Sequence, residues 1–167
     1  MAIAQRTAEV VWEGTLAGGV GALSTASGAL ELPVTWASRT ERPDGKTSPE
    51  ELIAAAHASC FAMALALVLG ENHTPPERLT VTAACTLDEV DGAPRITTAA
   101  LSVGARVSGL DRAGLRRNVE QAADLCPVSN ALRGNVEISV RDELDEGWSR
   151  ETAVLQPSTA PGNGHNL

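Results

Sequence analysis

Apolar and polar positions alternate with a period of two near the start of the chain, which predicts β-structure. Residues 5–13 alternate loosely and are expected to form a strand. The glycines of residues 14–21 mark a turn, and residues 23–34 predict one or two further strands, interrupted by Ser-Gly at their middle. Residues 37–47 are polar and contain proline and glycine, so we expect a loop there. The alternating apolar residues of the first strand are Ala8, Val10 and Trp12.

The pattern then becomes helical over the longest apolar segment of the chain. Ser48 is suited to the N-cap and Pro49 to the first helical position, while Glu51 would complete a capping box with Ser48. The helix is expected to run to Leu69 and to stop at Gly70. It is apolar on nearly all sides, so it must be covered on several sides. One small domain offers limited cover, and we therefore hypothesise a partner subunit.

A period of two returns after this helix. Residues 79–87 place apolar side chains on one face and threonines on the other, and residues 99–107 repeat the alternation. Asp91-Gly92 between them marks a turn, so the two segments predict a hairpin with one buried face. Cys85 lies on the apolar face, where a cysteine is usually a small core residue.

The remainder of the chain predicts a second helix and a last strand. Asp111 can cap a helix over residues 112–125, a short turn or helix follows, and residues 135–141 alternate as a strand. We expect residues 1–141 to form one domain and residues 142–167, which are acidic and then rich in Ser, Pro, Gly and Asn, to form a flexible tail. The element order is β-β-β-α-β-β-α-β, which predicts an α+β fold with a long buried central helix.

The composition excludes several classes of function. Asp and Glu number 21 and Lys and Arg number 13, and the resulting net charge of −8 argues against binding to nucleic-acid phosphates or anionic lipid. Aromatic residues make up only 2% of the chain, so stacking on bases or sugars lacks its usual side chains. No phosphate-binding glycine motif and no serine-nucleophile motif is present.

The cysteine count and the first residues bear on the compartment. Residues 53–69 are rich in alanine and interrupted by polar side chains, so we interpret them as a buried helix and not as a membrane span. The first ten residues carry no apolar region after a basic start, and we expect a cytoplasmic protein. Three cysteines in that compartment do not indicate a structural disulfide framework.

Cys60 and Cys126 differ in their predicted surroundings. Cys60 lies in the middle of the long helix, where burial raises a thiol pKa, so it needs a cation from elsewhere to react. The loop before the helix offers Arg39, Arg42 and Lys46. Cys126 precedes Pro127 and would lie at the start of a new helical turn, where backbone N–H groups favour a thiolate suited to thiol–disulfide exchange.

Two other polar residues of the helix have competing interpretations. Glu50 could orient an arginine of the preceding loop, or it could be a solvated carboxylate at a helix N-terminus. His57 shares a helix face with Cys60, but no second pair completes a metal site, and we expect a packed or hydrogen-bonded histidine. No metal or other cofactor is expected.

Two cysteine motifs carry a resemblance to a known family. The run KTSPEELIAAAHASCFAMAL (46–65), followed by LCPVSNAL (125–132), resembles the OsmC/Ohr family of osmotically inducible and organic-hydroperoxide-resistance proteins. The segments TLDEVDG (86–92) and VSGLD (107–111) are similar to it as well, and the resemblance covers roughly residues 5–141.

The resemblance implies an intertwined α+β homodimer with thiol-dependent peroxidase activity. By resemblance, Cys60 matches the peroxide-reacting cysteine, Cys126 the resolving cysteine and Glu50 the family glutamate that holds an arginine near Cys60. The implied cycle passes through a Cys60 sulfenic acid and a Cys60–Cys126 disulfide, and an external dithiol, of lipoyl type or another small dithiol, restores both thiols. The substrate would be an organic hydroperoxide, with hydrogen peroxide a weaker one.

The position of the arginine separates the branches of the family. In the Ohr branch it lies in the first β-turn region, which reads TLAGG (15–19) here and has none. In the OsmC branch it lies in the loop before the long helix, where this chain has Arg39, with Arg42 as the second candidate. The alternatives to a peroxidase are a dimer that binds a small apolar ligand and has inert cysteines, and a structural stress protein.

Overall fold

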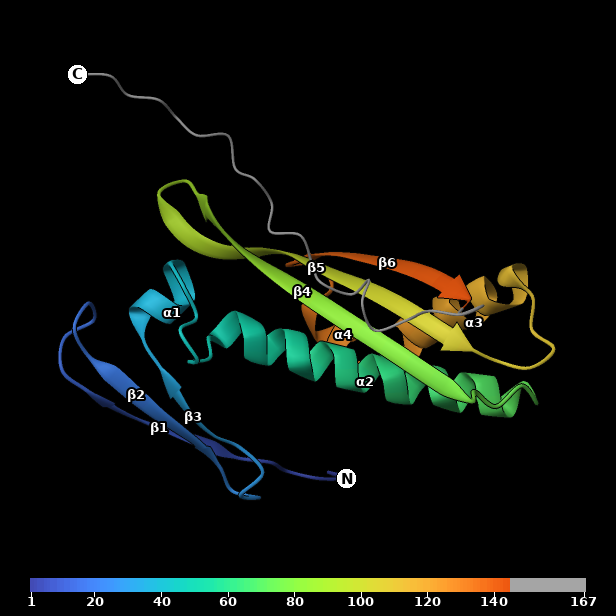
Figure 1. Cartoon of the computed structure of the whole chain (residues 1–167), viewed down its shortest axis with the longest axis horizontal. Helices are drawn as coiled ribbons and strands as arrows, with labels where there is room; N and C mark the ends of the chain where they lie inside the picture. The colour runs from blue at the N-terminus through green and yellow to red at the C-terminus, as the bar shows by residue number, and fades with distance from the viewer. Residues whose placement is uncertain (145–167) are drawn as a thin grey trace.

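The computed structural model describes residues 1–144, which form two three-stranded sheets and four helices (Figure 1). The predicted α+β class is confirmed, with one short helix, α1, added, and the short turn or helix expected after residue 126 is present as helix α4. In chain order the elements are β1 (Ala8–Glu13), β2 (Val20–Thr25), β3 (Glu31–Val34), α1 (Trp36–Thr40), α2 (Pro49–Glu71), β4 (Arg78–Val90), β5 (Ala93–Arg106), α3 (Arg112–Leu125), α4 (Pro127–Leu132) and β6 (Glu137–Leu144).

The first sheet is an antiparallel meander with the order β1-β2-β3. Its cross-strand register places apolar residues on one face, because residues directly opposite in an antiparallel pair point to the same side. Gly21 lies under this face, where an added Cβ would come within 2.7 Å of Val34 Cγ1 and 3.0 Å of Trp12 Cε3. We call this side the apolar face of the first sheet, and its residues are Val10, Trp12, Leu23, Leu32 and Val34.

Helix α1 occupies the start of the segment predicted as a loop over residues 37–47, so that prediction is wrong for residues 37–40. Thr35 and Ser38 form a reciprocal capping box, which stabilises a helix too short to produce a hydrophobic period. The Ser38 hydroxyl also donates to the Thr47 carbonyl at 2.8 Å. This bond closes the loop and holds α1 beside the start of α2.

Helix α2 begins as predicted and ends later. Ser48 is the N-cap and accepts from the Glu51 N–H at 3.1 Å. The predicted capping box is only half formed, because the Glu51 carboxylate accepts from the Thr47 hydroxyl at 2.8 Å. The helix runs through Gly70 to Glu71 and is capped by Asn72, so a single glycine does not stop it.

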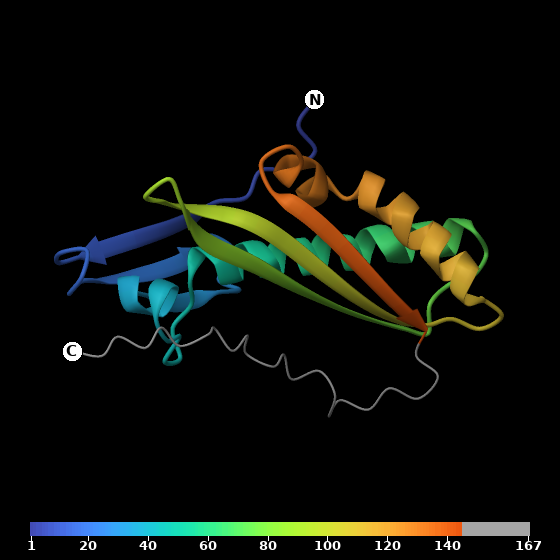
Figure 2. The ribbon, with the colours of Figure 1, turned by 90° about the horizontal axis from the view of Figure 1, so that it is seen from above.

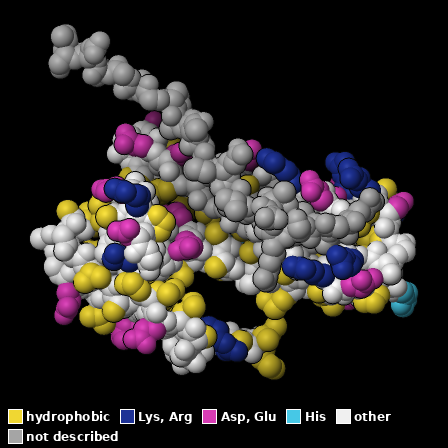
Figure 3. All heavy atoms as spheres, in the orientation of Figure 1, with side chains coloured by type: hydrophobic (Ala, Val, Ile, Leu, Met, Phe, Trp, Pro, Cys, Tyr) yellow, Lys and Arg dark blue, Asp and Glu magenta, His cyan; other side chains and the backbone are white. Residues whose placement is uncertain are grey.

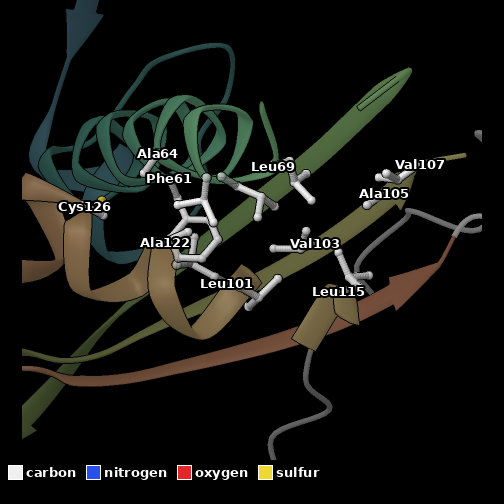
Figure 4. Packing of buried hydrophobic residues seen from close by; sticks show 13 residues of the cluster. Phe61, Ala64, Leu69, Leu101, Val103, Ala105, Val107, Leu115, Ala122 and Cys126 are labelled. Carbon is white, nitrogen blue, oxygen red and sulfur yellow. The ribbon is translucent and has the colours of Figure 1, made fainter. Parts of the chain in front are cut away.

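The second sheet has the order β4-β5-β6, with β4 and β5 antiparallel and β5 and β6 parallel. Figure 2 shows α2 running along this sheet, while α3 lies beside β6. The buried cluster fills the space between α2, α3 and β5, and Figure 4 shows Phe61, Leu101, Val103 and Leu115 converging there. Strand β6 continues to Leu144, so residues 142–144 belong to the domain and not to the predicted tail; residues 145–167 lie outside the described residues.

Much of α2 faces away from this core. Within residues 1–144, α2 is the one helix long and apolar enough to cross a bilayer by length and composition, and it packs one side against β4 and α3. Its other side leaves Met63 at 67% and Leu67 at 55% of their full exposure. Figure 3 shows further hydrophobic side chains gathered over the first sheet, where Val10 and Trp12 are also exposed. Two apolar surfaces of one chain are therefore uncovered.

Candidate active site: a paired dithiol on the central helix

Two distant cysteine motifs meet where α2 contacts α4. Cys60 lies near the middle of α2, and Cys126 is both the C-cap of α3 and the N-cap of α4. Both are free thiols, and each shifts the pKa of the other, which places the two side chains next to each other. Figure 4 places Cys126 at one end of the buried cluster, close to Ala64 and Phe61 of α2. Two neighbouring thiols are placed to form a disulfide after one of them is oxidised.

The two sulfurs differ in accessibility. Cys126 is fully buried, whereas Cys60 is partly exposed. Cys60 lies at the border between the core side of α2 and a stripe of apolar residues, with Ala56, Met63 and Leu67 exposed along that stripe. A solute therefore reaches Cys60 and not Cys126. Phe61, the next residue, is fully buried in the core, because one residue further along a helix rotates the side chain by about 100°.

The acidities of the two thiols run in opposite directions within one chain. Burial raises the pKa of Cys60, the Val128 N–H opposes this, and Cys126 raises it further. Burial also raises the pKa of Cys126, but Ser129, Cys60 and the backbone N–H of Val128 together lower it, and the pKa ends below its usual value. The Ser129 N–H lies 3.5 Å from the Cys126 sulfur. A reactive thiolate at Cys60 thus needs a positive charge that these neighbours do not supply.

The predicted Arg39–Glu50 pair forms at the start of α2. Arg39 donates to Glu50 Oε1 through Nε at 3.0 Å and through Nη2 at 2.7 Å, and its guanidinium also lies 5.8 Å from the centroid of the Trp36 ring. Both donors share one carboxylate oxygen, so the guanidinium does not bridge the two oxygens of Glu50. Glu50 Oε2 is buried and has no hydrogen-bond partner. Of the two interpretations of Glu50, the structure supports the one in which it orients an arginine.

This pair does not reach Cys60 within one chain. Ten residues of α-helix separate Glu50 from Cys60, a distance of about 15 Å along the axis. The guanidinium of Arg39 is held at Glu50, and no basic group is among those that shift the pKa of Cys60 in the described chain. Arg39 is therefore not in contact with Cys60 of its own chain, and the resemblance leaves open whether it acts on Cys60 of the same or of the partner subunit. Arg42, the second candidate, lies exposed between α1 and α2.

Two further side chains, a thiol and a histidine, lie near these sites. Cys85 is half-buried, and its pKa is raised by burial and by the carboxylate of Glu50, so it lies near that carboxylate and not within the central cluster. His57 is fully buried and hydrogen-bonds through Nε2 to Ser129 Oγ at 2.9 Å, as expected of a hydrogen-bonded histidine. Within residues 1–144, no group of three His, Cys, Asp or Glu side chains is placed to hold a metal.

Sequence reasoning missed Ser129. It is 1% exposed and contacts both Cys126 and His57. Its position three residues after Cys126 is the N3 position of α4, where the backbone N–H points back to the N-cap side chain. That spacing can be read from the sequence. The hydrogen bond to His57 cannot, because it joins residues 72 positions apart.

An α+β fold that brings Cys60 of a long apolar helix next to Cys126 at the junction of α3 and α4 defines a dithiol protein of the OsmC type. The family model described as OsmC-like protein matches residues 42–141. The chain belongs to the OsmC-like protein family, as the resemblance of its cysteine motifs predicted.

Relatives and solved structures agree with this assignment. The peroxiredoxin OsmC of Escherichia coli (strain K12) is 42% identical over 126 residues, which cover 75% of this chain and 87% of that protein. The crystal structure of the organic hydroperoxide resistance protein OhrB of Bacillus subtilis has a TM-score of 0.67 at 29% identity, covering 82% of this chain and 98% of that one. An organic hydroperoxide resistance protein OsmC from Legionella pneumophila has a TM-score of 0.67 at 26% identity, with 86% and 99% covered.

Proposed function

We propose that this protein is a thiol-dependent peroxidase that reduces organic hydroperoxides. The observation that carries the proposal is the contact between two free cysteines of which only Cys60 is reachable from outside. The names of the relatives, which include a peroxiredoxin and organic hydroperoxide resistance proteins, support the same activity.

The chemistry divides into three steps. The Cys60 thiolate attacks the distal oxygen of the hydroperoxide, the O–O bond breaks, and the alkoxide leaves and takes up a proton to become an alcohol. Cys60 is thereby oxidised to a sulfenic acid. Cys126 then attacks the sulfenic sulfur, a disulfide forms, and the oxygen leaves as water. An external dithiol, of lipoyl type or another small dithiol, reduces the disulfide and is itself oxidised to its disulfide.

The protein acts as a homodimer in this proposal. The uncovered stripe of α2 and the apolar face of the first sheet are both too apolar to remain in water, and a three-stranded sheet needs a packed face to be stable. Docking the apolar face of the first sheet of one subunit onto the α2 stripe of the other would cover both surfaces. Such an exchange of elements is the intertwined arrangement that the family resemblance implies.

The same dimer supplies the missing cation. Because Arg39 is held at Glu50, which lies about 15 Å from Cys60 along the helix axis of the same chain, we assign it to Cys60 of the partner subunit. Glu50 orients the guanidinium, and its unpartnered oxygen is available to accept a hydrogen bond from the hydroperoxide O–H. The positive charge would lower the pKa of Cys60 against the effect of burial.

The apolar stripe beside Cys60 favours a substrate with an organic group. Met63 and Leu67 present methyl and methylene surface next to the reactive sulfur, and burying such surface contributes about 25 cal/mol per Å². Hydrogen peroxide has no group to place there, so it should be the weaker substrate.

Single-turnover oxidation tests the proposal. The reduced chain is treated with one equivalent of an organic hydroperoxide, and alcohol release and protein mass are followed together. We expect one alcohol per Cys60 and a loss of two hydrogens as the disulfide forms. The Cys60→Ser variant should release none, while Cys126→Ser should release one alcohol and retain one added oxygen.

The outcome also separates the alternatives. Release of alcohol by Cys60→Ser, or none by the unsubstituted chain, would overturn the peroxidase assignment. A dimer that binds a small apolar ligand would instead show unreactive thiols and a melting temperature that rises with ligand concentration.

A further inference from the structure

Helix α1 carries an aromatic residue that the cycle above does not use. Trp36 is the first residue of α1 and lies three positions before Arg39, so the two side chains leave the helix on the same side. The centroid of its half-buried ring lies 5.8 Å from the guanidinium carbon of Arg39. A guanidinium within about 6 Å of an indole is attracted to the face of the ring.

The position of α1 is fixed by hydrogen bonds at both of its sides. Thr35 and Ser38 exchange hydrogen bonds of 3.0 Å at its start, and the Ser38 hydroxyl donates to the Thr47 carbonyl at 2.8 Å. Figure 1 shows α1 beside the N-terminal end of α2, where Glu50 lies. Trp36 and Arg39 are therefore carried to Glu50 by a short braced helix and not by an irregular loop.

The hydrogen bonds between Arg39 and Glu50 leave one degree of freedom open. Nε and Nη2 donate to the same oxygen, Oε1, at 3.0 Å and 2.7 Å. A bridge to both carboxylate oxygens would fix the plane of the guanidinium, whereas a single accepting oxygen allows that plane to tilt about it. A contact on the face of the guanidinium restricts this tilt. Trp36 supplies such a contact.

We propose that Trp36 is a positioning residue that fixes the plane of the Arg39 guanidinium. Glu50 holds one edge of the group and Trp36 one face, so the Nη1 end keeps one orientation in which it can meet the Cys60 thiolate of the partner subunit. The inference rests on the proposed function, because it takes the assignment of Arg39 to that thiolate from there. It also gives α1 a purpose, since Trp36 and Arg39 share a face only when this segment is helical.

The exposure of Arg39 explains why a second contact matters. The Arg39 side chain is 28% exposed, so water competes for its donors and a solvated orientation is open to it. Ordering a long side chain only when the sulfur or the hydroperoxide arrives costs conformational entropy at that moment. A guanidinium that is already held on an edge and a face avoids most of this cost.

The nearest other carboxylate on α2 does not replace this arrangement. Glu51 accepts from the Thr47 hydroxyl at 2.8 Å and is thereby engaged on its own side of the helix start. The remaining alternative is that Trp36 only fills space beside α1. The two readings differ in what they require, because filling space needs an apolar side chain whereas attraction to a cation needs an aromatic face.

Hydrogen exchange at Arg39 tests the contact directly and needs no peroxide. In the reduced full chain, the Nε–H signal of Arg39 is identified in nitrogen-15 spectra by its loss in Arg39→Lys. We expect Trp36→Leu, which keeps an apolar side chain but has no ring face, to speed exchange of this hydrogen with water about two- to fivefold. Trp36→Phe keeps a ring face and should stay closer to the unsubstituted chain. Ala37→Leu, at an exposed neighbour in α1, is the matched control and should have no effect.

Alkylation of Cys60 tests the consequence for the thiol. A chain carrying Cys85→Ala and Cys126→Ser retains Cys60 alone among its three cysteines, and its alkylation rate is followed against pH. Adding Trp36→Leu should lower the rate about two- to fivefold on the acid side of the transition, because a guanidinium that tilts away stabilises the thiolate less. Trp36→Phe should recover most of the rate. Arg39→Ala should lower it further than either variant.

The outcomes decide the role of Trp36 separately from the proposed function. Unchanged Nε–H exchange in Trp36→Leu, or equal effects of Leu and Phe in both measurements, would overturn the inference and leave Trp36 as a packing residue. A profile that shifts in Arg39→Ala but not in Trp36→Leu would overturn it as well. If Arg39→Ala leaves the Cys60 profile unchanged, the assignment of Arg39 to that thiolate fails, and Nε–H exchange still decides whether Trp36 positions the guanidinium.

Discussion

The assignment of Arg39 to the partner subunit leads to a test by subunit complementation. A Cys60→Ser subunit supplies Arg39 but no reactive sulfur, and an Arg39→Ala subunit supplies the sulfur but no cation. If the two act across the interface, a heterodimer of these subunits contains one complete site. Each homodimer contains none. Within one chain the same combination could not produce any complete site.

The electrostatic stabilisation of the Cys60 thiolate by Arg39 depends on the distance between the two groups, which helix α2 sets within one chain. At an effective dielectric constant of about 20, a cation about 4 Å from the thiolate contributes about 4 kcal/mol, whereas one about 15 Å away contributes about 1 kcal/mol before screening. Salt weakens the longer interaction further, because about 15 Å exceeds the Debye length at physiological ionic strength. Only the shorter distance can offset the burial that raises the pKa of Cys60.

The assay uses two affinity tags to isolate the heterodimer after co-expression. Hydroperoxide turnover with a dithiol should be about half that of the unsubstituted dimer, because one of two symmetric sites is complete. Both parent homodimers should be at least tenfold less active, since about 1.4 kcal/mol of lost thiolate stabilisation already costs tenfold.

A second heterodimer serves as the matched control. Cys60 and Cys126 contact each other within one chain, so Cys60→Ser combined with Cys126→Ser leaves no chain with both sulfurs. That heterodimer should show no recovery of turnover. A Cys60→Ser and Arg39→Ala heterodimer that is no more active than its parents would refute the intersubunit assignment.

Three further predictions concern assembly, packing and pH. Met63→Glu places a charge on the uncovered stripe of α2 and should convert the dimer to a monomer by light scattering, while the exposed control Glu71→Gln should not. Phe61→Ala empties a fully buried position and should lower the free energy of unfolding in urea by about 3–5 kcal/mol at fixed protein concentration; a loss below about 1 kcal/mol would contradict the packing described. Because burial holds the pKa of His57 below 6.5, the unfolded chain binds its proton first, so stability should fall as pH drops below 6.5. His57→Gln should flatten that part of the pH–stability profile, and an equal slope in both proteins would show that His57 is not the group responsible.

Local patterns in the sequence determined most of the fold. The caps Ser48 and Asp111 mark the starts of α2 and α3, and the turn at Asp91-Gly92, with positive φ at both residues, joins β4 and β5 as predicted. These features depend on residues within one or two turns of each other, so a single sequence contains them. The short α1 escaped prediction because five residues are too few for a hydrophobic period.

For the site as well, some features followed from the sequence and others only from the structure. The residue types and the motifs around Cys60 and Cys126 were sufficient to indicate a dithiol of this family, and the position of Glu50 was sufficient to suggest a partner for Arg39. The helix arithmetic that separates Glu50 from Cys60 was also present in the sequence. That separation keeps Arg39 away from Cys60 only because the structure pairs Arg39 with Glu50.

By itself, the sequence determined most of the secondary structure, the family and the identity of the two sulfurs, because these follow from local spacing and residue type. Only the tertiary structure decided which sulfur is accessible, that Ser129 joins His57 to Cys126, and that α2 leaves an apolar side uncovered. These properties depend on contacts between elements far apart in the chain. Burial and charge are properties of the surroundings of a side chain, and the packing of α2 against α3 and α4 creates those surroundings.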